Sequence, residues 1–393
     1  PLYAATLRAQ GEGDRIGSVV VAASVEAEKR NASVSARATG IQLPKWLPYV
    51  PANTRLPARI ERGSLDVEAT ALVTGGKLLD YHGSARLRQG RVRVPQLRAP
   101  IREIEVAARF TPSSVVVDTL RARSGSLLLT GRASALGVKD PWVTASLSTG
   151  PLREADIRAL VPSLPRLPDI QLGKIERVEV VAVGPLSQLQ ARVNLDLSRV
   201  DRPEAGLSDI HLAARAVGRQ HVVVESFTAR VAGGTLAAKA QIDLSGKEPR
   251  YTARGSLRGL DLRALRLKKY LEGDPPAGVI SADFQAEGAG ARPRVRARID
   301  ADSLQWKGWG VDKAQVQAAY ADGKVAVEHA QVLAPEGALV ARGEVDLKGP
   351  LHLEVSAQEI DLTAIGRKLG QEKVRGNVYV RGSVTGTLKE PSF

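Results

Sequence analysis

The sequence contains no cysteine and no methionine, and aromatic residues make up only 4% of its 393 residues. Without cysteine the chain can form no disulfide, Cys-ligated zinc site, iron–sulfur cluster or thiol nucleophile. The few aromatic rings leave little bulk to fill a thick globular core. Because the chain opens at Pro1 with strand-like patterning, we expect a piece of a longer protein whose signal or membrane anchor lies elsewhere.

The sequence also lacks the residue clusters that carry catalysis or bind metals. Its histidines are not paired at metal-ligand spacing; they are His82, His211, His221, His329 and His352. No Gly-x-Ser-x-Gly nucleophile elbow occurs beside a plausible base. We therefore expect a non-enzymatic protein with no catalytic residue, no metal site and no cofactor, and a hydrolase is the most remote alternative.

No run of about 18 apolar residues occurs, so the sequence predicts no membrane-spanning helix. Basic residues number 56 and acidic residues 42, so the net charge is +14, and the excess is spread along the chain. This charge suits a soluble surface, or attraction to anionic lipid headgroups or acidic partners. We expect no nucleic-acid binding, because no Lys/Arg block is interleaved with aromatics.

Strict alternation of apolar and polar residues runs through most of the chain. From Leu65 to Val73 every second residue is apolar, and Asp66 and Glu68 lie between them. Such a period predicts strands with one apolar and one wet face. Helical periodicity is confined to short pieces at 154–161, 261–271 and 361–369. The predicted class is all-β and antiparallel with a few short helices.

Three landmarks recur along the chain at intervals of 100 to 110 residues, which predicts a repeat architecture. A Val-x-Val pair followed by an acid occurs at 115–118, 222–225 and 325–328, where the acids should lie on a wet face or at a strand end. Strands open at Leu127, Leu236 and Leu339. An Asp-aliphatic-x-x-aliphatic piece begins at 156, 261 and 361, where the aspartate is expected to cap a short helix. A weaker copy stands at 41–46.

These landmarks divide the chain into one partial and three full units. The predicted boundaries are a partial unit at 1–60, then repeat units at 61–165, 166–272 and 273–393. An antiparallel sheet this long should either split into sandwiches or coil into one long twisted and curved sheet. Because the apolar residues are small, we expect the second outcome, a half-pipe or β-taco whose apolar face lines one continuous groove.

An apolar groove of this length far exceeds the apolar area that soluble proteins normally expose, so a ligand should cover it. An acyl chain is the expected ligand, since each buried CH₂ contributes about 0.8 kcal/mol. The residues predicted to line the groove are Leu65, Val67, Val115, Val117, Leu127, Leu129, Val222, Val224, Leu236, Ala238, Ile242, Val325, Val327, Leu339, Ala341, Val345, Val378 and Val380.

The repeat length and the strand motifs resemble the AsmA-like family, including its TamB-like members. The motif Gly-x-Val-x-Gly-x-Leu-x-x-Pro stands at 382–391, and related forms occur at 184–186 and 288–293. The resemblance implies a periplasmic protein of the cell envelope, anchored in the inner membrane, that moves phospholipids toward the outer membrane. It also implies an outer-membrane β-barrel as a partner in barrel or autotransporter assembly.

Two other functions fit the same pattern. In the first, the protein is a scaffold or chaperone whose exposed sheet edge pairs with incoming barrel strands by β-augmentation. In the second, it is a secreted β-rich adhesin. Adhesin solenoids have much shorter repeats, so the interval near 105 residues argues against that class.

Overall fold

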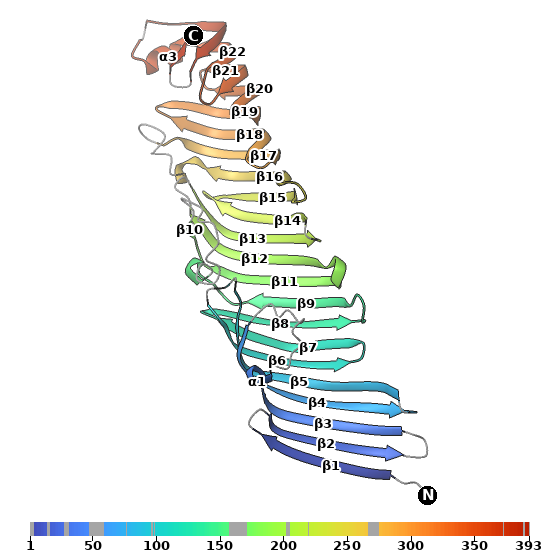
Figure 1. The fold of residues 1–393 in the computed structure, drawn as a ribbon. Helices are drawn as coiled ribbons and strands as arrows, with labels where there is room; N and C mark the ends of the chain where they lie inside the picture. The colour runs from blue at the N-terminus through green and yellow to red at the C-terminus, as the bar shows by residue number, and fades with distance from the viewer. Residues whose placement is uncertain are drawn as a thin grey trace. The chain divides into compact units, whose positions relative to one another are not determined.

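The computed structural model describes residues 4–13, 16–26, 31–46, 59–75, 77–95, 97, 99–156, 171–201, 205–218, 220–265, 275–371, 373–387 and 390–392. These residues form long strands and a few short helical turns (Figure 1). The all-β antiparallel class is therefore confirmed. The chain divides into two compact units, 1–168 with 173–196, and 169–172 with 197–393.

Unit 1 holds the first strands of the chain. They are β1 (Ala4–Gly13), β2 (Ile16–Glu26), β3 (Asn31–Gln42), β4 (Arg59–Thr74), β5 (Lys77–Arg93), β6 (Ile101–Thr111), β7 (Ser114–Ser124), β8 (Leu127–Leu136), β9 (Trp142–Thr149) and β11 (Ile175–Pro185). Short helical turns interrupt them at α1 (Leu43–Trp46), at 154–156 and at η2 (Leu186–Gln188). From β1 to β9 each strand pairs antiparallel with the next, and β11 pairs antiparallel with β9.

Unit 2 continues in the same manner. Its strands are β10 (Gln171–Leu172), the end of β12 (Gln190–Asp201), β13 (Gly206–Val217), β14 (His221–Val231), β15 (Gly234–Asp243), β16 (Arg250–Asp261), β17 (Ala277–Ala289), β18 (Arg292–Trp306), β19 (Trp309–Ala321), β20 (Lys324–Ala334), β21 (Gly337–Asp346), β22 (Leu351–Asp361), β23 (Asn377–Gly386) and β24 (Pro391–Ser392). Its helical turns are η3 (Leu262–Ala264) and α3 (Leu362–Lys368). From β13 to β24 each strand pairs antiparallel with the next.

The order of elements repeats along the chain. Among the described residues, β4 to β9 precede a helical turn at 154–156, β11 to β16 precede η3, and β17 to β22 precede α3. The predicted helix at 361–369 is confirmed by α3. The helix predicted at 154–161 begins as predicted, and its remaining part, 157–161, lies outside the described residues. The helix predicted at 261–271 is wrong at Leu265, because only the short turn η3 forms at Leu262–Ala264 and Leu265 is extended (φ −80°, ψ 141°). Residues 266–271 lie outside the described residues. The weak copy at 41–46 contains α1.

The acid of each Val-x-Val landmark marks a β-bulge. The ladder shifts register after Val117, Val224 and Val327, on the strands β7, β14 and β20. The acid that follows each of these valines has no direct partner on the preceding strand. An extra residue bends the strand and increases its local twist. The repeated acid therefore recurs where the sheet bends, once in every repeat of the element order.

The third landmark caps a helical turn at two of its three sites. The Asp261 carboxylate accepts a hydrogen bond from the Arg263 N–H (2.9 Å), and Asp361 accepts from Thr363 (2.8 Å) and Ala364 (3.1 Å). These caps confirm the predicted role. Asp156 differs, because its carboxylate accepts from the N–H of Arg153, three residues before it (2.9 Å).

Replacing Asp361 by alanine is expected to loosen α3. The N–H groups of Ala364 and Thr363 hold the pKa of Asp361 below its ordinary value of 3.8. A lowered folded pKa means that this stabilisation is present above the unfolded pKa and is lost as the pH falls through the folded pKa. We expect amide exchange in α3 to accelerate roughly two- to tenfold in Asp361→Ala at neutral pH. Acidification through the folded pKa of Asp361, which lies below 3.8, should progressively remove the difference from the parent chain.

The sheet encloses no thick core. Within the described residues no large side chain is fully buried, and six of the thirteen buried apolar residues are alanines. Several buried residues lie at strand ends beside the helical turns, as Leu260 and Ala277 do next to η3. A second packed layer would enclose large side chains. The described strands therefore form a sheet whose broad faces keep contact with solvent.

Candidate functional site

One face of the sheet in unit 1 is continuously apolar. Directly paired residues project from the same face of an antiparallel ladder, so the register identifies that face. One row crosses seven strands, and its residues are Val67, Ala85, Ala108, Val117, Ala133, Ala145 and Ala182. The next row is Leu65, Leu87, Val106, Leu120, Gly131, Leu147 and Val180. No charged residue interrupts either row.

Unit 2 has a corresponding apolar face. One of its rows crosses ten strands without a charge, and its residues are Ala214, Val224, Ala240, Ala253, Ala286, Val295, Tyr320, Val325, Val345 and Leu351. A parallel row contains Ala229, Leu236, Leu257, Ala282, Ile299, Val316, Ala330, Ala341, Val355 and Gly382. Apolar residues, all of them small or aliphatic except Tyr320, thus form a continuous surface from β13 to β23.

The structure brings all of the predicted lining residues onto these two apolar faces. In unit 1 the register places Leu65, Val67, Val115, Val117, Leu127 and Leu129 on its apolar face. In unit 2 it places Val222, Val224, Leu236, Ala238, Ile242, Val325, Val327, Leu339, Ala341, Val345, Val378 and Val380 on the other. Each bulge reverses the alternation of its strand, so the residues after it follow a shifted pattern.

Most of these side chains are only partly buried. Ala341 is the one buried member of the predicted set, with 9% exposure, whereas Val115 and Val380 are 48% and 52% exposed. A valine or leucine in a closed core would be almost fully buried. The apolar faces are therefore large surfaces that remain open to a ligand.

The few aromatic rings on these faces lie along the sheet. Phe110 is the direct partner of Gly83, and its Cζ atom lies 2.5 Å from where a Cβ on that glycine would be. Phe284 extends over its partner Gly255 in the same way, and Tyr251 over Gly288. A ring that occupies the Cβ position of its neighbour cannot stand up from the sheet. The glycines thus allow aromatic residues without obstructing the apolar face.

The opposite face of each unit is polar and is crossed by ion pairs. Arg109 binds the bulged Asp118 through two hydrogen bonds (2.6 and 2.9 Å), which hold the pKa of Asp118 below its ordinary value. Arg215 pairs with the bulged Glu225 at 3.2 Å. At the third bulge the position that corresponds to these arginines is Ala319, so Glu328 has no equivalent arginine opposite it. Exposed pairs of this kind contribute little stability individually.

Two hollows, of about 680 and 920 Å³, lie in unit 2, the first over β14 to β20 and the second over β13 to β19. On most of these strands three consecutive residues line each hollow. The side chain of the middle residue projects from the apolar face, and the side chains of the two flanking residues project from the polar face. Both share the row formed by Lys239, Arg254, Gln285 and Arg296. Because polar-face side chains border each hollow on both sides, the hollows lie on the polar face. The sequence reasoning missed them, since the cations that border them are far apart in the sequence.

Neither a metal site nor a membrane helix emerges from the described part of the chain. In that part no group of three or more His, Asp or Glu side chains could hold a metal ion. None of the helices described there is both long and apolar enough to cross a membrane.

No protein-family model, curated protein or solved structure matches the chain. The AsmA-like resemblance therefore stays a prediction from the sequence motifs.

Proposed function

We propose that the apolar faces of both units bind the acyl chains of phospholipids and that the protein is a non-enzymatic lipid carrier. The observation that supports this most directly is the long uncharged row in unit 2, from Ala214 to Leu351. All of its residues except Tyr320 are aliphatic, and all except Leu351 are only partly buried. Such a surface is far larger than the apolar patches that soluble proteins normally leave uncovered.

An acyl chain matches this surface in both size and chemistry. Burying a chain of about 16 carbons against aliphatic side chains contributes on the order of 10 kcal/mol at about 0.8 kcal/mol per CH₂. The rows offer no buried polar group that would hold a lipid at one position. A lipid can therefore move from one strand to the next at little cost, which suits a conduit better than a single closed pocket.

The AsmA-like motifs extend this proposal to a place in the cell. They favour a periplasmic location in the envelope of a bacterium with two membranes, with an anchor in the inner membrane. They also favour phospholipid movement toward the outer membrane. The apolar surface described above is the physical feature that such a role requires.

The proposal is tested by native mass spectrometry of the purified chain after incubation with phosphatidylethanolamine and phosphatidylglycerol vesicles. We expect mass increments of several phospholipids per chain, because the apolar rows cross many strands. A chain that stays free of lipid would contradict the proposal and would favour a scaffold that pairs with other proteins through its sheet edge.

A further inference from the structure

The polar face of unit 2 carries a row of basic side chains that lack acidic partners. Lys239, Arg254, Gln285 and Arg296 are direct neighbours on β15 to β18, and Arg294 lies two residues from Arg296 on the same face. Within the described residues, no carboxylate lies within 4.0 Å of the cationic groups of Lys239, Arg254, Arg294 or Arg296. All four side chains are exposed.

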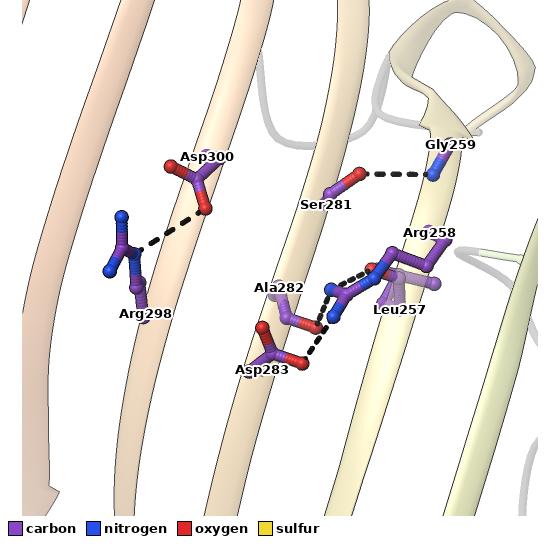
Figure 2. A network of polar contacts seen from close by, with 8 residues as sticks. All are labelled: Leu257, Arg258, Gly259, Ser281, Ala282, Asp283, Arg298 and Asp300. Carbon is purple, nitrogen blue, oxygen red and sulfur yellow. Dashed lines mark hydrogen bonds and ion pairs between the residues drawn. The ribbon is translucent and has the colours of Figure 1, made fainter.

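Nearby arginines on the same face are neutralised. Arg258 pairs with Asp283 at 2.5 Å and donates a hydrogen bond to the carbonyl oxygen of Ala282 at 3.0 Å (Figure 2). Arg298 pairs with Asp300 at 3.6 Å (Figure 2). Within the described residues, the lack of an ion pair at Lys239, Arg254 and Arg296 is therefore local and not a general property of this face. Three neighbouring cations attract an anionic ligand more strongly than isolated cations do.

The two hollows give this row the form of a binding surface. The row separates them, and one extends from β14 to β20 and the other from β13 to β19. At about 4.8 Å between strands, six spacings make each hollow roughly 29 Å long. The bottom of each hollow, between the bordering side chains, is formed by backbone and by small residues such as Ala240, Ala253 and Gly255. An extended segment of about nine residues has the same length.

We propose that this surface binds an extended acidic polypeptide segment that lies across the strands, with its carboxylates on Arg254 and Arg296. Guanidinium groups bind carboxylates with two parallel hydrogen bonds. Arg254 and Arg296 lie on strands two apart, so they are roughly 10 Å apart. This distance matches residues three apart in a segment with polyproline II conformation, which rises about 3.1 Å per residue and presents every third side chain on the same face. The amide of Gln285 lies between them and can bond the peptide backbone.

The same surface disfavours a polyphosphate or a nucleic acid. Asp283, Glu287 and Glu328 line the hollows beside the cations. These carboxylates would repel a polymer that carries a negative charge on every monomer. A polypeptide can instead have acidic residues opposite the arginines and neutral residues elsewhere. Aromatic rings that could stack on bases are also missing from this site, because Phe227, Phe284 and Tyr320 project from the apolar face. This interaction is independent of the lipid proposal, since it uses the opposite face.

The test is fluorescence anisotropy of the full chain with a fluorescein-labelled peptide of about ten residues in which every third residue is aspartate and the others are serine. We expect the double substitution Arg254→Gln and Arg296→Gln to weaken binding at least about tenfold and to reduce its salt dependence. The matched control is the double substitution Arg342→Gln and Arg381→Gln, which removes the same charge from the same face outside the hollows. It should bind nearly as well as the parent chain.

Three results would overturn the proposal. The parent chain could fail to bind the peptide, both double variants could lose equal affinity, or a polyphosphate competitor could bind at Arg254 and Arg296 more tightly than the peptide. Thermal unfolding of each variant checks that the fold persists. Phospholipid occupancy by native mass spectrometry should be unchanged in both variants, so a failure here is distinguishable from a failure of the lipid proposal.

Discussion

Val224→Asp is expected to reduce phospholipid binding by unit 2 more than about tenfold, whereas Val223→Asp is expected to leave it unchanged. Val224 is a half-buried member of the ten-strand apolar row and pairs with Ala214 and Ala240. A carboxylate at this position must either lose its hydration when an acyl chain covers it or keep the lipid away. Leaving a buried charge unpaired costs several kcal/mol.

Val223 is a matched control, because it is the adjacent residue on the same strand and is also half-buried. Its partners are Arg215 and Gln241, so its side chain projects from the polar face. An aspartate there lies beside an arginine and cannot touch a lipid on the opposite face. The same design applies in unit 1 with Val117→Asp against Val116→Asp, since Val116 pairs with Arg109 and Ser134.

The measurement is the number of phospholipids retained per chain in native mass spectrometry. Transfer of a fluorescent phospholipid between vesicles provides an independent reading of movement. Equal retention by Val224→Asp and Val223→Asp would contradict the assignment of the lipid to the apolar face. Circular dichroism of both variants establishes that the strands remain formed.

Gly343→Ala is expected to lower the free energy of unfolding of unit 2 by about 2–4 kcal/mol. The φ angle of Gly343 is +144°, which L side chains rarely adopt. A Cβ at this position would also overlap the carbonyl oxygen of His352 and come within 2.9 Å of the Leu353 Cα on the neighbouring strand. Both obstacles are backbone atoms, so they cannot move aside without disrupting the ladder between β21 and β22.

Gly382→Ala is the control, because Gly382 lies on the same apolar face and a Cβ there would meet nothing within 4 Å. We expect that substitution to change stability by less than about 0.5 kcal/mol. Urea unfolding measures the difference in stability, and amide exchange of β21 and β22 shows whether the loss is local. If the two substitutions had equal effects, the clash with the His352 carbonyl would be excluded as the cause.

Alternation alone was sufficient to predict which valines and leucines share a face. A strand places every second side chain on one face, so Leu65 and Val67, or Leu339 and Ala341, are assigned correctly from local sequence. The landmarks at Asp261 and Asp361 were equally readable, since an aspartate before a short apolar-periodic piece caps the helical turn that follows. The lipid role of these faces stays a prediction that the variants above test.

The bulges could not be read from the sequence. Val117, Val224 and Val327 each precede an extra residue, after which the alternation is reversed. In the sequence a bulge is visible only as a change in the phase of the apolar–polar alternation, and an irregular turn would produce the same change. The register of two neighbouring strands is needed to distinguish them, because a bulge is defined by two residues opposite one.

The sequence by itself determined the all-β class, the two-faced strands, the repeating landmarks and the helix caps, because each depends on residues within a few positions of one another. Only the tertiary structure decided which residues of distant strands become neighbours. The row of Lys239, Arg254 and Arg296 draws its members from three strands across almost 60 residues, and the flat packing of Phe284 over Gly255 joins two strands. Both depend on the ladder register, which long-range pairing sets and local sequence does not encode.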